Sequence, residues 1–157
     1  MIKITKKRLP RSAGGFTLIE LLVTLAIIGI LISISTFAIT QAQQSARNNR
    51  RKADLETIRS GLEMYRSDCG QYPPAPIGNT LIGSGATPSC AATNTYIKVV
   101  PQDPQAASGK FYRYAWLTNT TYELCANQEG FSDAEVVTCG GSNNCGTDFC
   151  HYQVTSP

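Results

Sequence analysis

The chain is poor in histidine, the side chain that most often serves as a general acid or base in catalysis. It contains one histidine, His151, close to the C-terminus and three residues after Asp148. No motif joins this histidine to a nucleophile and an orienting acid, and no glycine-rich phosphate-binding loop occurs. We therefore expect no enzymatic activity, and we interpret His151 as a surface residue of the C-terminal tail.

Acidic residues are also missing from the N-terminal part, where none precedes Glu20. Five basic residues do precede it: Lys3, Lys6, Lys7, Arg8 and Arg11. The chain has 14 Lys and Arg against 11 Asp and Glu, a net charge of +3, and removing those five leaves 9 against 11, a net of −2. The basic balance thus belongs to a leader. Because the rest also lacks interleaved cations and aromatics, we expect no nucleic-acid partner.

Between Phe16 and Ile39 the only ionisable residue is Glu20. As a helix this segment would be ~36 Å long, enough to cross a hydrocarbon core of ~30 Å. The basic leader predicts a cytoplasmic N-terminus and an exported C-terminal part. A secretory signal peptide would be cut after its apolar core, but Gly14 and Gly15 precede this one, so a cut there leaves the helix attached. A plain membrane anchor explains neither the glycine pair nor Glu20.

Glu20 lies about one turn inside the apolar segment, where a carboxylate costs a few kcal/mol. A cut between Gly15 and Phe16 would create an α-amino cation four residues before Glu20. That cation could pair with Glu20 of its own chain or of a neighbouring one, and a pairing between neighbours would set the axial register of a helix bundle. The alternative is a carboxylate at the membrane interface that extends into the head groups.

The run Gly15-Phe16-Thr17-Leu18-Ile19-Glu20, after a basic leader and before an apolar segment, resembles the class III signal of type IV prepilins and type II secretion pseudopilins. The resemblance implies that a prepilin peptidase cuts after Gly15 and N-methylates Phe16. It also implies that Glu20 and Thr17 support subunit docking in a filament. One departure is Phe37, where many filament subunits carry a helix-breaking proline.

The organisation that we expect has four parts: a leader over 1–15 that is removed, a transmembrane and filament-core helix over 16–39, an amphipathic helical stem over 40–70, and an extracytoplasmic head with a Cys-rich tail over 71–157. Leu55, Ile58, Leu62 and Tyr65 recur at helical spacing and predict the face that packs on the head. The alanines at 42, 46 and 53 could extend this stripe. Gly70 is expected to cap the helix in a left-handed conformation.

The expected fold class is α+β, a type IV pilin fold in which the long helix packs on a small antiparallel sheet. Strands are predicted at Phe111–Trp116, Thr121–Ala126 and Glu135–Cys139. The segments 62–73 and 96–114 are similar to the helix end and the proline-aspartate-proline turn of major pseudopilins. The tail from Cys125 onward lies outside this resemblance.

Charge divides between the stem and the head. The stem carries six cations against three acids, whereas the chain from Ser67 onward carries three cations against seven acids. One interpretation is a solvated helix with internal pairs such as Arg59 with Glu63. The other is contact between the stem and acidic heads of neighbouring subunits.

No cysteine precedes the apolar segment, and six follow it: Cys69, Cys90, Cys125, Cys139, Cys145 and Cys150. An even number on one side of a membrane span predicts disulfides in an oxidising compartment, with 15 pairings open. Zinc is the alternative, but the spacings are unlike those of zinc sites. No cofactor is expected apart from a possible calcium ion, for which Asp133, Glu135, Asn143 and Asp148 offer oxygen ligands; acidic loop residues are more often simply solvated.

These observations predict a structural subunit of a type IV pilus-like filament, anchored in the inner membrane with its head periplasmic or extracellular. The alternatives are a major pseudopilin of a type II secretion system and, in another class, a monomeric membrane-anchored binding module. The expected partners are further copies in a homo-oligomeric filament, minor pilins or pseudopilins, the prepilin peptidase, the assembly ATPase with its inner-membrane platform, and membrane lipid.

Overall fold

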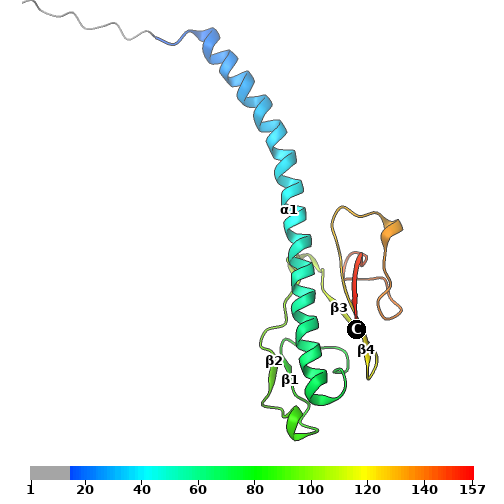
Figure 1. The fold of residues 1–157 in the computed structure, drawn as a ribbon. Helices are drawn as coiled ribbons and strands as arrows, with labels where there is room; N and C mark the ends of the chain where they lie inside the picture. Colours follow the sequence, from blue (N-terminus) through cyan, green and yellow to red (C-terminus); the bar gives the residue numbers. More distant parts are fainter. Residues whose placement is uncertain (1–14) are drawn as a thin grey trace, which may run out of the picture. The chain divides into compact units, whose positions relative to one another are not determined.

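A computed structural model describes residues 15–157, so most of the expected leader, residues 1–14, lies outside the described residues. The chain divides into two compact units that meet between Thr40 and Gln41. Helix α1, Leu18–Cys69, contributes to both (Figure 1). The expected α+β class, with one long N-terminal helix and small antiparallel sheets, is confirmed.

In the first unit, side chains along α1 are exposed without exception from Leu18 to Thr40. An 18-residue window of this helix has a mean hydropathy of 2.5, and none of the window is buried. Among residues 15–157, α1 is the one helix long and apolar enough to cross a membrane. The first unit therefore has no protein core of its own.

In the second unit, α1 buries the stripe expected from its spacing: Leu55, Ile58, Leu62 and Tyr65. A Cβ atom at Gly61 would collide with the side chain of Ile97, so glycine lets strand β2 approach the helix closely. The helix ends at Cys69, and Gly70, with φ at +75°, caps it by donating its N–H to the Arg66 carbonyl at 2.8 Å. The predicted left-handed cap is confirmed.

The predicted extension of the stripe by alanines was wrong. Ala42, Ala46 and Ala53 are exposed, and Arg51 continues the buried face instead. The short alanine side chains at those positions stay exposed, whereas the guanidinium of Arg51 reaches two loops of the head. The physical basis of that burial is a set of ion pairs, described below.

The head contains two antiparallel sheets. Strand β1 (Leu81–Ile82) pairs with β2 (Thr95–Ile97), and β3 (Arg113–Thr118), β4 (Thr121–Ala126) and β5 (Tyr152–Thr155) form a sheet in that order. Short 3-10 helices occupy Pro88–Cys90, Ala106–Ser108 and Asp133–Glu135. The strand predicted at 121–126 is found with those bounds, and the one predicted at 111–116 begins two residues later.

The strand predicted at 135–139 was wrong, and β5 was not anticipated. Within the predicted strand, Glu135 ends a 3-10 helix, and Cys139 forms only an isolated bridge with Ser142. This segment lies against the face of the β3–β4–β5 sheet, because Gln153 donates to the Thr138 carbonyl at 3.2 Å and Gly140 donates to a Glu123 carboxylate oxygen at 2.6 Å. A chain lying across a face has no strand edge to pair with.

Alternate residues of β4 supply two separate cores. Tyr122, Leu124 and Ala126 face α1 and join the main core. Cys125, on the opposite face, joins a small core of four buried cysteines with Ala115 and Val137 packed against it. The two-residue period of a strand thus places a helix on one face of the sheet and the Cys-rich tail on the other (Figure 1).

Candidate functional site: the processing junction and the two ends of the helix

The described chain begins at the proposed cleavage junction. Gly15 is exposed, and no heavy atom lies within 4 Å of the place where a Cβ atom would sit. Packing within the described residues therefore does not require glycine there. Phe16 is 80% exposed. Both residues are open to another molecule, which recognition by a peptidase would need.

Thr17 caps the start of α1. The backbone N–H of Glu20 donates to Thr17 Oγ1 at 3.3 Å, and that of Leu21 donates to the Thr17 carbonyl at 3.3 Å. Glu20 lies in the first helical turn, where its negative charge is favourable for the helix dipole. The Thr-x-x-Glu spacing has the form of a capping box, a signal that the sequence analysis did not use. The helix therefore starts almost directly after the proposed cut.

The membrane-length part of α1 presents no unpaired hydroxyl among its described residues. Each hydroxyl there donates to a carbonyl three or four residues earlier in the helix; the donors are Thr24, Ser33, Ser35, Thr36 and Thr40. Such bonding removes the cost of placing a hydroxyl in hydrocarbon. The surface of this segment is therefore suited to lipid or to other apolar helices along its whole length.

Where α1 enters the head, a buried ion cluster holds it. Arg51 is fully buried, and its Nε and Nη2 donate to the two Asp103 carboxylate oxygens at 2.8 and 3.1 Å. Nη2 also donates to Gln105 Oε1 at 2.8 Å, and Nη1 donates to Asn48 Oδ1 at 2.9 Å and Glu129 Oε1 at 3.0 Å. The guanidinium thus joins α1 to two head loops, and hydrogen bonds offset its desolvation.

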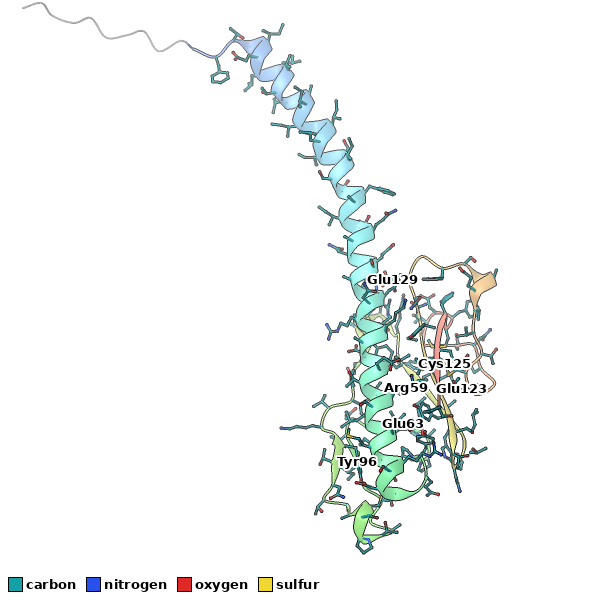
Figure 2. The ribbon with its side chains drawn as sticks, in the orientation of Figure 1. Arg59, Glu63, Tyr96, Glu123, Cys125 and Glu129 are labelled. Carbon is teal, nitrogen blue, oxygen red and sulfur yellow. A yellow bond between two sulfur atoms is a disulfide. The ribbon has the colours of Figure 1, made fainter. Side chains whose placement is uncertain are left out.

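Arg47, one turn earlier, completes this cluster. Its Nε and Nη2 donate to the two oxygens of Glu129 at 2.7 and 2.6 Å. Asn48 accepts from the Glu129 backbone N–H at 2.9 Å, and Figure 2 shows Glu129 beside the helix, at the opposite end of the head from Tyr96. We call Arg47, Arg51, Asp103 and Glu129 the clamp. Two stem cations thus pair with their own head, so they are not free for a neighbouring subunit.

The clamp changes the acid–base behaviour of Glu129. Hydrogen bonds from Arg47, opposed by partial burial, lower the pKa of this carboxyl from its usual 4.5 to about 2. A carboxylate with a depressed pKa in the folded state stabilises the fold above its unfolded pKa, and that stability is lost as the pH falls through the folded value.

We therefore expect the urea midpoint of the wild-type chain to fall between pH 4.5 and about 2 by more than the midpoint of Glu129→Gln. The measurement is equilibrium unfolding at a series of pH values, followed by the fluorescence of Trp116, the single tryptophan. Because other carboxyl groups titrate in both proteins, the difference between the two curves isolates Glu129. Parallel curves would contradict the assignment.

A tyrosine cluster secures the far end of the helix. Tyr72 Oη donates to the two Glu63 oxygens at 2.8 and 3.0 Å, and Tyr122 Oη donates to one of them at 3.2 Å. Burial, with the Glu63 charge adding to it, raises the pKa of Tyr122. The expected Arg59–Glu63 pair is replaced, because Arg59 pairs with Glu56 at 3.7 Å. Figure 2 shows Arg59 and Glu63 on α1.

All six cysteines are paired: Cys69 with Cys90, Cys125 with Cys139, and Cys145 with Cys150. The first bridge ties the end of α1 to the loop before β2. The second crosses from β4 to the tail, and the third closes a short loop within the tail. Disulfides were expected, but only the fold selects one pairing among 15.

The structure gives two of the four possible calcium ligands, Glu135 and Asp148, other side-chain roles. Glu135 accepts from the Ser132 backbone N–H at 3.2 Å in a capping box, and Asp148 pairs with Lys110 at 2.9 Å. The Asn143 carbonyl accepts from the Cys150 N–H at 2.8 Å, and the side chain of Asp133 lies outside the described ones. Within the described part of the chain, no group of three His, Cys, Asp or Glu residues could hold a metal ion.

Comparisons with known proteins agree with this architecture. Residues 10–36 match the prokaryotic N-terminal methylation motif, and residues 38–148 match type II secretion system protein G. The second match continues through most of the Cys-rich tail, so the resemblance extends further than the sequence analysis placed it. Among solved structures, none matches the chain.

Several relatives carry the name type II secretion system core protein G. The one from Aeromonas hydrophila is 31% identical over 98 residues, which cover 60% of this chain and 68% of the relative. The one from Escherichia coli K12 is 32% identical over 94 residues, covering 57% and 65%. The one from Pseudomonas aeruginosa is 31% identical over 108 residues, covering 66% and 74%.

The matched segments thus span about two thirds of these relatives. Their names favour the secretion alternative over the type IV pilus that the sequence analysis put first. An exposed apolar helix, the methylation motif at its start and the match over the stem and head all agree, and the chain belongs to the type II secretion system protein G family of pseudopilins.

Proposed function

We propose that this chain is a pseudopilin that polymerises into the filament of a type II secretion system. The observation that carries the proposal is the apolar half of α1, which is exposed along its whole length directly after Gly15 and Phe16, in a chain whose stem and head match protein G. An apolar helix without a protein core must be covered by lipid before assembly and by other copies afterwards.

Each part of the chain then has a task. The leader directs the chain to the inner membrane with its head in the periplasm, and the prepilin peptidase removes the leader after Gly15 and methylates Phe16. The new amine and Glu20 set the register between neighbouring helices. The assembly ATPase and the inner-membrane platform add subunits, and minor pseudopilins join the same filament. The clamp, together with the hydrogen bonds from Tyr72 and Tyr122 to Glu63, holds the head on the stem during assembly.

Filaments purified from the native cells should consist of chains that start at N-methylated Phe16, as measured by intact mass and N-terminal peptide analysis. Deletion of the gene should stop extracellular accumulation of the secreted proteins, with those proteins retained in the periplasm. Wild-type chain supplied in trans should restore secretion, and Gly15→Leu should not, since the leader would stay attached.

The other assignments give different results. A type IV pilus subunit would be required for long surface fibres while secretion continued without it. A monomeric binding module would remain in the membrane fraction and would not appear in sheared filaments. A filament whose chains retain residues 1–15 would refute the processing step.

A further inference from the structure

A surface at one end of the head has features that the proposed function does not use. Two adjoining cavities of about 320 and 400 Å³ lie between the first turns of α1 in the second unit and the loop Asn127–Phe131. Both are lined by Gln44 of the helix and by residues 128–131 of the loop. We call this loop, with its cavities, the 127–131 surface.

The smaller cavity has mostly polar walls, and about half of the wall of the larger one is polar. Gln128 is only 4% exposed, and its Nε2 has no hydrogen-bond partner within residues 15–157. His151 also has both ring nitrogens enclosed and unpartnered within that range, and its ring lies 6.1 Å from that of Phe131. The expectation that His151 is a plain surface residue was therefore wrong. An unpaired buried donor costs free energy that a polar group entering the cavity would offset.

The charged side chains that line the cavities are equal in number, Lys52 and Lys110 against Glu129 and Asp148. Lys110 pairs with Asp148 at 2.9 Å and Arg47 pairs with Glu129 at 2.6 Å. Lys52 forms no ion pair among residues 15–157, and its ammonium lies 5.4 Å from the centroid of the Tyr152 ring. The chemistry suits a group that carries both signs or none, such as a zwitterionic phospholipid head group.

Two phenylalanines stand at the rim of this polar site. Phe131 is 45% exposed and Phe149 is 41% exposed, and both line the smaller cavity. Neither belongs to the cores of the head. Aromatic side chains beside polar groups are typical of surfaces that lie in the boundary between head groups and acyl chains.

The 127–131 surface adjoins a part of the helix that follows the apolar segment closely in the sequence. Gln44, which lines both cavities, is five residues beyond Ile39, the last residue of the apolar segment. Five residues span at most ~18 Å when fully extended and ~8 Å as helix. The head-group layer on each side of a bilayer is ~5–8 Å thick. Gln44 therefore lies at most ~18 Å along the chain from the end of the apolar segment.

We propose that, before assembly, the 127–131 surface rests on the outer leaflet of the membrane, with Phe131 and Phe149 in the interface and a zwitterionic head group in the polar cavities. This proposal rests on the membrane anchoring that is part of the proposed function. It gives the unassembled subunit a second attachment to the membrane, which must be released when the subunit enters the filament.

The test uses the single tryptophan as a depth probe. Trp116 lies in β3, away from this surface, so the double variant Trp116→Phe/Phe131→Trp moves the probe to the rim, and both positions are exposed. Each full chain is placed in phosphatidylethanolamine–phosphatidylglycerol vesicles in which part of the lipid carries brominated acyl chains. Fluorescence at position 131 should be quenched several-fold more strongly than Trp116 of the unchanged protein.

A matched pair of further substitutions tests the contact. In the double-variant background, Phe149→Ser should weaken quenching, whereas Leu117→Ser, at an apolar position in β3 of similar exposure, should not. Quenching should persist at high salt because the charged side chains that line the cavities sum to no net charge; its loss in salt would overturn the head-group assignment.

Vesicle flotation distinguishes the contact of the 127–131 surface from membrane anchoring by the apolar helix. A chain that floats with vesicles but is quenched no more at position 131 than at Trp116 overturns this inference and leaves membrane anchoring intact. A chain that does not float refutes the anchoring itself. Unquenched, concentration-dependent blue-shifted emission at position 131 would show that a second copy covers the surface, and would also overturn the inference.

Discussion

Replacing Arg51 by methionine should lower the free energy of unfolding of the head by about 3–5 kcal/mol, the range found when one partner of a buried ion pair is removed. Arg51 and Asp103 both have fully buried side chains. The substitution retains the apolar stem of the side chain and leaves the Asp103 carboxylate enclosed without its cation. Urea unfolding of the full chain in detergent, followed by Trp116 fluorescence, measures the change.

Arg50→Met is the matched control. Arg50 is adjacent in the helix but two thirds exposed, with a 3.8 Å pair to Asp54, so the change should be no more than about 1 kcal/mol. The double variant Arg51→Met/Asp103→Leu should recover part of the loss, because it removes the stranded charge. Equal effects of Arg51→Met and Arg50→Met on the free energy of unfolding would show that the clamp stabilises the head no more than an exposed arginine on the helix does.

Replacing Glu20 by alanine should abolish filament assembly while leaving membrane insertion intact. Insertion becomes easier when a carboxylate is removed from an apolar segment. Assembly, in contrast, would lose the acid that we propose pairs with the new amine of Phe16. The yield of sheared filaments, compared with the amount of chain in the membrane fraction, measures both steps in one culture.

Glu20→Gln separates charge from shape, since it retains the size of the side chain and should also fail to assemble. Thr17→Val tests the capping role on its own: it removes the acceptor for the Glu20 N–H and should cost about 1 kcal/mol of helix stability, with filaments reduced rather than lost. Normal filament yield from Glu20→Ala would remove the basis of the register argument.

Two kinds of pattern in the sequence were sufficient for their predictions. The helical spacing of Leu55, Ile58, Leu62 and Tyr65 predicted the buried face of α1, and Gly70 predicted its end. The segment Thr121–Ala126, bounded by turn-forming residues, predicted β4 with the correct bounds. Each of these signals is local, because the residues that carry it lie within a few positions of one another.

The errors have a shared cause. Arg51 and Asp103 are 52 positions apart, and the Arg47–Glu129 pair is separated by 82. No local pattern reports such partners, although an arginine in line with the apolar stripe was the signal that could have suggested a buried cation. The segment 135–139 is rich in β-branched residues, as strands are, yet bonds to Gln153 and Glu123 hold it on a sheet face.

The sequence by itself determined the membrane-length helix, the glycine before it and the carboxylate inside it, because these depend on order and composition alone. The number and placement of the cysteines likewise predicted disulfides. Only the tertiary structure decided which cysteines pair, which stem cations turn inward to the clamp, and that the 127–131 surface gathers two exposed phenylalanines around polar cavities. These features join residues far apart in the chain, and folding alone brings them together.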